Sequence, residues 1–391
     1  MTVIFWILIG IVGYSYLGYT LLLYALNLLK KRKHQIESTI DRDFEPEVTL
    51  FVAAYNEIDI VNEKVNNSFQ LDYPKQKIIH LWITDGSDDG TPEMLRKYEN
   101  LRVLHQHKRE GKIGAMNRGM QFVTTPIVIF SDANSMLSEN AVREIVRFFA
   151  NPETGCVAGE KQIIKQKTDK AVSSGEGFYW QYESYIKKLE SNFNTVIGAA
   201  GELFAIRANL YQAVEPDTIL DDFVIFLRIA EKKYKIKYAS EAIAIESSSA
   251  GIAEEMKRKI RIAAGCIQTL IRFRDLLNPF KYGMFSLQYI SHKVIRWTIV
   301  PFAFPIIFLL NILIFFNDDT IHYLYKTLLQ LQIIFYLFAI LGYALKNIKF
   351  RFRYLFIPYY LVIMNIAIIK GMLRYFSKKQ TVNWEKVKRM R

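Results

Sequence analysis

Asp132 and Asn134 place a carboxylate and a carboxamide two residues apart, directly after the apolar stretch Ile127–Phe130. Such a stretch is typical of a strand that is buried on both faces of a parallel sheet. Ligands bind where such strands end, and oxygen donors at this spacing suit Mg²⁺ or Mn²⁺ carrying a diphosphate. A strand that ends in an Asx turn is the alternative interpretation of this one motif.

Two further apolar stretches end in polar residues that carry carboxylates. Val48–Ala54 runs into Tyr55 and Glu57, and Lys77–Ile83 runs into a loop that contains Asp85. A helical pattern separates the two stretches, and this alternation predicts a nucleotide-binding α/β sheet. Because the carboxyl ends of parallel strands meet at one edge of a sheet, we expect the acidic residues to converge there.

A segment with glycine and lysine, Arg109–Gly119, opens the next helical pattern at Gly111 and Lys112. A helix N-terminus with a nearby ammonium group suits phosphate oxygens. The segment lacks the spacing of a Walker A loop. It therefore predicts phosphate binding of a different kind from that of the P-loop proteins.

An apolar stretch without a charge runs from Thr2 to Leu29 and is followed at once by the basic residues 30–33. It is long enough to span a bilayer, and it lacks the basic start and small-residue cleavage site of a signal peptide. Because the positive charges follow it, we expect a retained anchor with its N-terminus outside and the next domain in the cytoplasm. A buried core helix is the alternative, which an uncharged stretch of this length disfavours.

Three more apolar segments stand later in the chain, at Trp297–Phe316, Tyr323–Leu345 and Tyr354–Met372. The acidic loop after the first is expected outside, and the basic loop Lys346–Arg353 after the second is expected inside. A simple third crossing would leave the basic tail Lys378–Arg391 on the wrong face. We therefore expect a broken, re-entrant or interfacial passage, with the tail in the cytoplasm. Three residues interrupt this last segment: Pro358, Asn365 and Lys370.

The formal net charge of +13 is concentrated beside the membrane segments. Residues 30–33 and 346–391 together carry +15, which leaves −2 for everything else. Charge in these places suits an anionic cytoplasmic leaflet, so nucleic acid is not expected as a partner. Cys156 and Cys266 stand beside neither a second cysteine nor a histidine, which predicts reduced thiols without a metal or disulfide role.

Four motifs follow one another along the chain: Ala-Ala-Tyr-Asn-Glu (53–57), Thr-Asp-Gly-Ser-Asp-Asp-Gly-Thr (84–91), Gly-Lys-Ile-Gly-Ala-Met-Asn (111–117) and Ser-Asp-Ala-Asn (131–134). The motifs and their order resemble those of glycosyltransferase family 2, in particular those of its membrane branch of hyaluronan, chitin, poly-N-acetylglucosamine and cellulose synthases. The resemblance extends from Val48 to about Arg261. It implies an α/β fold with a nucleotide-binding, GT-A-type mixed sheet and helices on both faces, plus transmembrane and interfacial helices.

The resemblance also implies a nucleotide-binding set: Ala54, Tyr55, Glu57, Asp85, Lys112, Ser131 and Asp132. In that set Tyr55 and Glu57 would flank the nucleobase and ribose. Asp85 would accept a hydrogen bond from the uracil edge, and Lys112 would lie near the phosphates. The metal, Mg²⁺ or Mn²⁺, would be held by Asp132 and Asn134. Asn134 replaces the second aspartate that is usual in the family, so the implied site has one negative charge fewer.

Two further motifs complete the implied site. Gly198–Arg207 resembles the acceptor-side segment, so Gly201 and Glu202 would lie beside the acceptor; a glycine-rich turn before a strand is the alternative. Leu220–Phe223 resembles the motif whose last acid is the general base. That base would be Asp222, with Asp221 beside it, although an exposed helix N-terminus would also favour acids here.

Arg258 and Arg261 stand where the synthases have Gln-x-x-Arg-Trp, and Ile262 replaces the tryptophan. The family's tryptophan stacks on the growing chain, so its replacement leaves processive synthesis open. The two arginines would bind the acceptor or help to stabilise the leaving diphosphate. Solvated or lipid-facing charge on one helical face is the alternative.

The expected organisation has six parts: an anchor (1–29), a basic linker (30–47), a cytoplasmic glycosyltransferase domain (48–265), amphipathic interfacial helices (266–296), membrane segments (297–376) and a basic cytoplasmic tail (377–391). The leading hypothesis is an inverting, metal-dependent β-glycosyltransferase that moves a sugar from a UDP-sugar to a growing polysaccharide at the cytoplasmic membrane face, coupled to export. One alternative is transfer of a single sugar to polyprenyl phosphate or a glycolipid. Another is a membrane protein that binds a sugar nucleotide without turnover.

Overall fold

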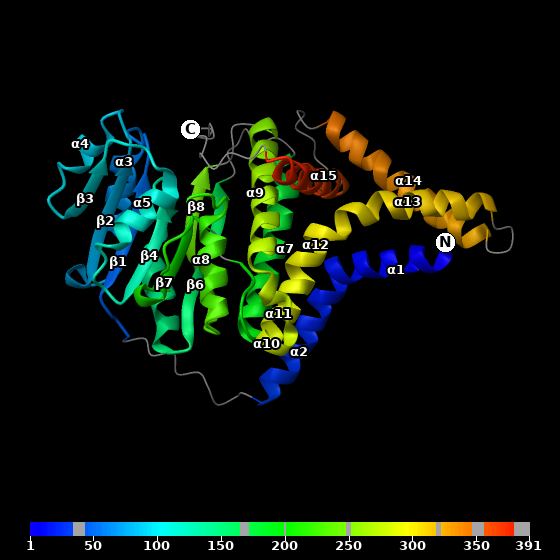
Figure 1. The fold of residues 1–391 in the computed structure, drawn as a ribbon, viewed down its shortest axis with the longest axis horizontal. Coiled ribbons are helices and arrows are strands. Elements are labelled where there is room, and N and C mark those ends of the chain that lie inside the picture. Colours follow the sequence, from blue (N-terminus) through cyan, green and yellow to red (C-terminus); the bar gives the residue numbers. More distant parts are fainter. Residues whose placement is uncertain are drawn as a thin grey trace. The chain divides into compact units, whose positions relative to one another are not determined.

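The computed structural model describes residues 1–33, 44–164, 172–198, 201–247, 252–317, 322–345 and 356–378 (Figure 1). The chain divides into two compact units. A sheet unit includes Lys30–Ile164 and Glu190–Ser248, and a helical unit includes Met1–Leu29, Lys165–Leu189 and Ser249–Gln380. Residues 48–265, which were expected to form one domain, are divided between the two units. The predicted basic loop at 346–353, Asp318–Asp319 and the basic tail from residue 379 lie outside the described residues.

One mixed sheet forms the sheet unit, and its strand order in the described part of the chain is β3-β2-β1-β4-β7-β6-β8-β5. The strands are β1 (Val48–Ala54), β2 (Ile78–Asp85), β3 (Leu101–Gln106), β4 (Ile127–Asp132), β5 (Met136–Leu137), β6 (Thr154–Ile164), β7 (Leu203–Arg207) and β8 (Lys235–Ser247). Strands β1 to β4 are parallel, whereas β7 runs antiparallel to both β4 and β6. The mixed sheet that the resemblance implies is therefore confirmed.

Helices cover both faces of this sheet. Leu50 and Val52 of β1 share a core cluster with residues of α3 (Val61–Phe69) and α6 (Ala141–Val146). Phe51 points to the opposite face, because side chains alternate along a strand, and it meets α5 (Gly111–Met120) there. A Cβ at Gly119 of α5 would lie 2.4 Å from the Phe51 ring, so this glycine lets α5 approach the sheet closely. Two further helices belong to the unit: α4 (Thr91–Leu95) and α8 (Asp221–Glu231).

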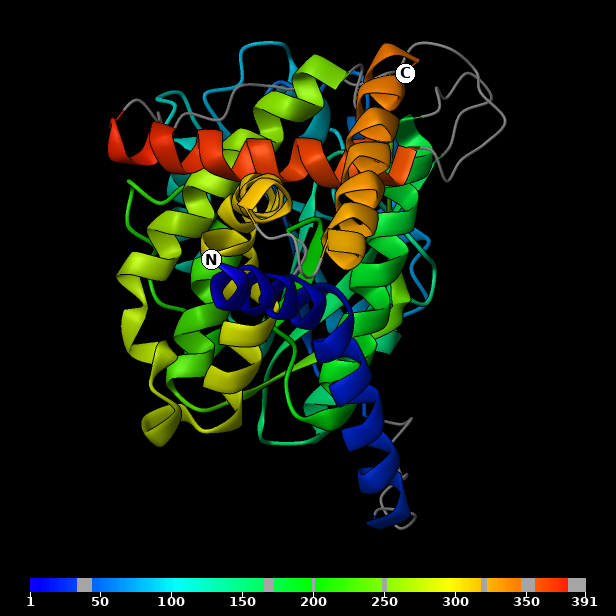
Figure 2. The same cartoon turned by 90° about the vertical axis from the view of Figure 1, so that its right-hand side faces the viewer.

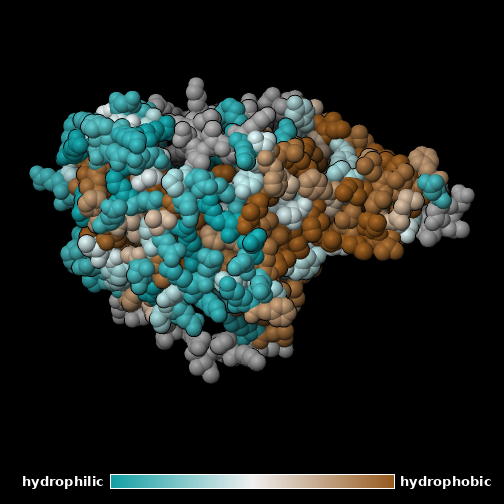
Figure 3. Space-filling view, in the orientation of Figure 1, coloured by the Kyte–Doolittle hydropathy of each residue, from teal (hydrophilic) through white to brown (hydrophobic). Residues whose placement is uncertain are grey.

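The helical unit carries the apolar segments. Its helices are α1 (Thr2–Gly13), α2 (Tyr19–Lys33), α7 (Val172–Phe193, as far as Leu189), α9 (Ile252–Arg272), α10 (Pro279–Tyr282), α11 (Met284–Tyr289), α12 (Ile295–Thr298), α13 (Val300–Asn317), α14 (His322–Ala344) and α15 (Phe356–Phe376). Within the described residues, four helical stretches are long and apolar enough to cross a membrane: Thr2–Lys30, Val300–Asn317, Tyr323–Ala344 and Phe356–Phe376. Figure 3 shows hydrophobic residues gathered over α1, α13 and α14.

The N-terminal apolar stretch is helical throughout but it is not straight. A π-helical turn, Tyr14–Gly18, separates α1 from α2. Figure 1 shows α1 and α2 running in clearly different directions on the two sides of this turn. π-Helical turns are a recognised cause of helix bends. The predicted anchor Thr2–Leu29 therefore consists of two helical arms.

α15 is continuous, so a broken or re-entrant passage of the last apolar segment is wrong. Pro358 lies in its first turn, where the missing N–H breaks no helical hydrogen bond. The Asn365 side-chain amide donates to the Leu361 carbonyl oxygen of the same helix at 2.8 Å, so the helix accommodates this polar residue. In Figure 2, α13 is seen nearly end-on and α1 is foreshortened, while α15 lies across the view. If α1 and α13 cross a bilayer, this is the orientation of an interfacial helix.

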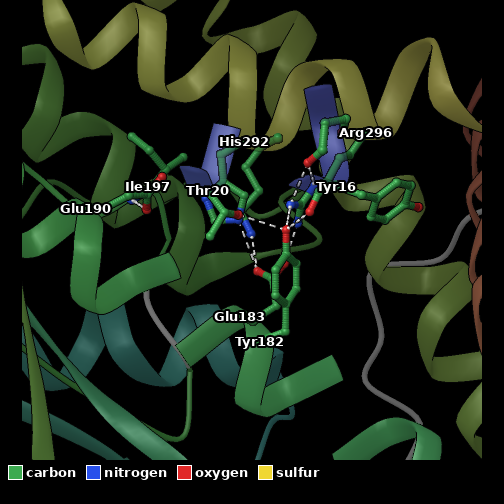
Figure 4. Close-up of polar contacts among 10 residues, drawn as sticks. Tyr16, Thr20, Tyr182, Glu183, Glu190, Ile197, His292 and Arg296 are labelled. Atoms are coloured by element: carbon green, nitrogen blue, oxygen red, sulfur yellow. Dashed lines mark hydrogen bonds and ion pairs between the residues drawn. The ribbon is translucent and has the colours of Figure 1, made fainter. Parts of the chain in front are cut away.

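A buried ionic cluster joins three parts of the helical unit (Figure 4). The Glu183 carboxylate of α7 accepts hydrogen bonds from His292 at 3.2 Å, Lys293 at 2.9 Å and Arg296 at 2.5 Å. The Arg296 guanidinium also donates to the carbonyl oxygen of Ser15, from two nitrogens at 2.9 and 3.2 Å. The cluster thus ties α7 and α12 to the bend of the N-terminal helix.

Candidate active site

Lys112, Asp132 and Asp221 meet at the centre of the candidate site. Asp132 ends β4, Lys112 is in the first turn of α5, and Asp221 begins α8. The Lys112 Nζ lies 2.9 Å from Asp132 Oδ1 and 3.4 Å from Asp221 Oδ2. Two carboxylates that are distant in the sequence therefore converge on one cationic position within the sheet unit.

A small pocket lies beside these groups and is lined by Phe51, Ala53, Lys112, Met116, Phe130, Ser131, Asp132 and Gly201. Gly201 stands directly against the Asp222 side chain. A Cβ at Gly201 would lie 2.9 Å from Asp222 Oδ2, closer than real Cβ contacts come. The glycine therefore lets the predicted acceptor-side loop lie against the predicted base.

Asp222 follows Asp221 in the first turn of α8, and its Oδ1 accepts a hydrogen bond from the Phe223 N–H at 2.8 Å. Burial and the neighbouring Asp221 carboxylate raise the pKa of Asp222 to about 7, although Lys112 acts in the opposite direction. A carboxylate with a pKa near the working pH is well suited to remove a proton. The role of Asp222 as the base remains a prediction, and its environment agrees with that role.

A buried lysine that the sequence analysis missed holds the predicted acceptor-side residue Glu202. The Lys161 side chain is 1% exposed, and its ammonium group donates to Glu202 Oε1 and to Glu246 Oε2, the latter at 2.6 Å. The three residues come from β6, from the segment before β7, and from β8. No spacing in the sequence links them, because the sheet alone brings them together.

A second buried lysine, Lys64 of α3, lies behind Asp132. Its ammonium group donates to Ser131 Oγ at 2.8 Å and to the Ser135 carbonyl oxygen, so it holds both ends of the turn that carries Asp132. Burial lowers the pKa of Lys64 to about 7, and the Asp132 carboxylate opposes that shift. The sequence did carry a signal for Lys64, because it shares the buried stripe of its helix with Val65.

Asp85 is placed differently from the central carboxylates. Its Oδ2 accepts hydrogen bonds from the N–H groups of Glu110 and Gly111 at 2.9 and 2.6 Å, and its Oδ1 lies 3.4 Å from Arg118. The N–H groups of Glu110 and Gly111, at the start of α5, are therefore taken by a carboxylate. The contact of Lys112 with the phosphates stays a prediction. The contact of Asp85 with uracil remains a prediction.

Ala54, Tyr55 and Glu57 lie at the end of β1 and in the loop after it. The Arg109 guanidinium stacks over the Tyr55 ring at 3.8 Å from the ring centroid. The Glu57 N–H donates to Thr91 Oγ1 at 3.0 Å, which joins the loops that follow β1 and β2. Their predicted roles at the nucleobase and ribose stay predictions.

Arg258 and Arg261 lie on α9 in the helical unit. A guanidinium nitrogen of Arg258 is 3.6 Å from Glu255 Oε2 on the same helix. The predicted acceptor contacts of the two arginines are not tested by this arrangement and remain predictions.

The residues around Asp132 fit a divalent cation that also binds a diphosphate. Asp132 and Asp221 present oxygens to one cationic position, and such oxygens are the ligands that Mg²⁺ and Mn²⁺ prefer. The described residues hold no group of three or more His, Cys, Asp or Glu side chains placed to bind a metal by themselves. Mg²⁺ is commonly held by one or two carboxylates together with substrate phosphates, which matches this set. Asn134 lies in the turn between β4 and β5, and its part as a ligand stays a prediction.

The sequence matches the model of glycosyl transferase family 2 over residues 49–214. A poly-beta-1,6-N-acetyl-D-glucosamine synthase of Staphylococcus epidermidis is 23% identical over 290 residues, which are 71% of this chain and 67% of that protein. The synthase of the same name from Staphylococcus aureus (strain MSSA476) is 24% identical over 265 residues, 65% of this chain and 63% of that protein. The chain thus spans about two thirds of the length of these relatives.

A solved structure shares the fold over almost the whole chain. The mannosyltransferase PcManGT from Pyrobaculum calidifontis, in complex with GDP-Man and Mn²⁺, has a TM-score of 0.69 and 20% sequence identity. The similarity covers 96% of this chain and 99% of the other, and with the mixed sheet it shows the GT-A type of fold. The protein is therefore a glycosyltransferase, and its residues 49–214 match the model of glycosyl transferase family 2.

Proposed function

We propose that the protein is an inverting, metal-dependent β-glycosyltransferase that moves a sugar from a UDP-sugar to a growing polysaccharide at the cytoplasmic membrane face. The observation that carries the proposal is the convergence of Asp132 and Asp221 on the Lys112 ammonium group, beside Asp222. Such a site combines a base with charges that can bind a diphosphate. A polysaccharide product is proposed because the relatives are named poly-beta-1,6-N-acetyl-D-glucosamine synthases.

Each group has a chemical task in this reaction. The Asp222 carboxylate takes the proton of the acceptor hydroxyl while that oxygen attacks the anomeric carbon. Lys112 supplies positive charge beside the departing diphosphate. A divalent cation, held by Asp132 and Asp221, would add Lewis-acid stabilisation of the same leaving group. Attack from the face opposite the diphosphate inverts the anomeric carbon without a covalent intermediate.

Transfer of one sugar to a lipid acceptor is the second candidate, and Ile262 favours it. The resemblance to the synthases implies a tryptophan at that position, stacked on the growing chain, and isoleucine offers no aromatic face. The length of the product separates the two candidates, because a synthase makes a ladder of chain lengths and a single-transfer enzyme makes one product.

The proposal is tested by incubating the detergent-purified protein with UDP-sugars, with GDP-mannose, and with Mg²⁺ or Mn²⁺. GDP-mannose is included because Asp85, the predicted uracil contact, is already engaged by three donors of the protein. The expected result is metal-dependent release of UDP and a product of inverted configuration. Binding of sugar nucleotides without release from any of them would support the alternative of a non-catalytic binding protein.

The proposed topology has the N-terminal helical stretch Thr2–Lys30, α13 and α14 crossing the membrane, and α15 lying at its cytoplasmic surface. The crossed orientation of α15 and the basic residues at 346–391 support this arrangement. The sheet unit and the chain's basic tail would then lie on the same side of the membrane. This side is the cytoplasm, because Lys30–Lys33 follow the first segment.

Thiol labelling of single-cysteine variants tests this topology. In intact cells, Asn317→Cys at the end of α13 is expected to react with a membrane-impermeant maleimide, and Ser377→Cys after α15 is not. Both positions are exposed in the structure, whereas the native Cys156 and Cys266 are buried. Strong labelling of Ser377→Cys in intact cells would mean that α15 crosses the bilayer.

The pH dependence of kcat/KM is expected to follow Asp222. Its pKa of about 7 means that the carboxyl group is largely protonated, and inactive as a base, below that pH. The rate should therefore fall roughly tenfold per pH unit below pH 7 and level off above it, since kcat/KM reports ionisations of the free enzyme. A profile that is flat between pH 5.5 and 8 would contradict the assignment.

A further inference from the structure

The ammonium group of Lys112 occupies the place where the two central carboxylates meet. It lies 2.9 Å from Asp132 and 3.4 Å from Asp221. The side chains of Lys112, Asp132 and Asp221 are 22%, 16% and 17% exposed, so water screens these charges only partly. Electrostatic contacts at this position are therefore stronger than those of an exposed ion pair.

Lys112 carries its full charge in this surrounding. Burial alone would lower the pKa of Lys112, but the carboxylates of Asp132 and Asp221 outweigh burial and raise it above the ordinary lysine value. The other buried lysines near the site have different partners. Lys161 contacts Glu202 and Glu246, and Lys64 contacts a hydroxyl and a carbonyl oxygen.

A divalent cation and the Lys112 ammonium group need the same oxygens. The metal would bind through Asp132, whose Oδ1 already accepts the hydrogen bond from Lys112. Two positive groups cannot share that carboxylate closely without strong repulsion. A diphosphate changes the balance, because it offers the lysine other anionic oxygens within reach of its flexible side chain.

We propose that Lys112 is an internal counter-ion that competes with the divalent metal for Asp132 and Asp221, and that it moves to the donor diphosphate when the metal enters. Metal and nucleotide then bind cooperatively, and the metal binds weakly before the donor arrives. By linkage, the nucleotide strengthens metal binding by the same factor as the metal strengthens nucleotide binding. The inference rests on the proposed use of a sugar nucleotide and a divalent cation at this site.

The test measures Mn²⁺ binding directly, without turnover. The loss of the free Mn²⁺ electron paramagnetic resonance signal is followed for the full-length protein in detergent, with and without UDP or GDP. The wild type is expected to bind Mn²⁺ at least tenfold more tightly when the nucleotide is present. Lys112→Met is expected to bind Mn²⁺ alone at least tenfold more tightly than the wild type, and to lose most of the enhancement by nucleotide.

Three further variants control the interpretation. Lys112→Gln, which also removes the charge, should behave like Lys112→Met, so the test does not depend on the folding of one variant. Lys108→Met removes a positive charge at an 82% exposed position four residues before Lys112 and should leave Mn²⁺ binding unchanged. In Lys112→Met combined with Asp132→Asn, the tighter Mn²⁺ binding should disappear.

The outcomes separate this inference from the proposed function. Wild-type protein that binds neither UDP nor GDP, with or without Mn²⁺, would overturn the proposed function itself. A different result would overturn the counter-ion role only. In that case nucleotide binding is normal, but Lys112→Met and Lys112→Gln bind Mn²⁺ alone no more tightly than the wild type.

Discussion

Replacing Asp222 with asparagine is expected to lower kcat by about 10³-fold, while nucleotide binding is retained. General-base catalysis typically contributes 10²- to 10⁴-fold, and asparagine keeps the shape of the side chain but cannot take a proton at neutral pH. The Asp222 carboxylate lies against Gly201 and beside Asp221, so the exchange removes a charge without opening a cavity. Steady-state rates of nucleotide release and calorimetric binding of UDP or GDP would measure the two parts of this result.

Two other aspartates give matched controls. Asp221→Asn removes a contact of Lys112, so it should act mainly through metal and donor binding and raise the donor KM more than it lowers kcat. Asp217→Asn changes an exposed aspartate in the segment before α8 and should leave both constants close to the wild-type values. Turnover of Asp222→Asn at the wild-type rate would refute the assignment of the base.

The parts of the site that the sequence could predict are local. Asp132 follows a short apolar, β-branched run that is typical of a buried strand, and Asp222 stands in the first turn of a helix, where acidic residues are favoured. The partners of Asp85 and Glu202 could not be predicted in this way. Asp85 reaches the start of α5, and Glu202 is held by Lys161 from a different strand. Both contacts exist only because the sheet brings distant segments together.

In the fold, too, local features could be predicted from the sequence, whereas features that depend on the three-dimensional structure could not. The strand Val48–Ala54 was predicted at its observed bounds, because a short apolar run between polar loops has few alternatives. Hydropathy likewise found the four long apolar helices, among the described residues, that suit a membrane. It could not show the bend at Tyr14–Gly18, which depends on a π-helical turn. The sequence alone also does not show where α15 begins, and Pro358 is compatible with the helix because it lies in the first turn.

Glu183→Gln is expected to destabilise the helical unit strongly. The Glu183 side chain is 4% exposed and faces His292, Lys293 and Arg296, so its loss as an anion leaves buried positive charge without compensation. Breaking a buried ion pair in this way costs about 3–5 kcal/mol, which corresponds to a fall of at least about 5 °C in the midpoint of thermal unfolding in detergent. Glu254→Gln, which removes an exposed contact with Lys257, is the matched control and should change the midpoint by about 1 °C or less.

The pH dependence of this contribution has a definite sign. Burial would raise the pKa of Glu183, but its contacts with Lys293, His292 and Arg296 outweigh burial and hold the pKa well below 4.5. A carboxylate whose pKa is lowered in the folded state stabilises the fold above its unfolded pKa, and this stabilisation is lost as the pH falls toward the folded value. The difference in midpoint between wild type and Glu183→Gln should therefore be full at pH 7 and shrink below about pH 4.5.

A double-mutant cycle shows whether the cost comes from the cluster or from each side chain separately. Arg296→Met removes the cation that bridges Glu183 and the Ser15 carbonyl oxygen, and alone it leaves the carboxylate with two partners. Combined with Glu183→Gln, it removes an anion and a cation together, so less uncompensated charge remains than after either change separately. The double variant should thus be clearly less destabilised than the sum of the two single variants. Strictly additive changes in stability would mean that the two groups do not act as a pair. The bend at Tyr14–Gly18 would then be held by the packing of the surrounding side chains.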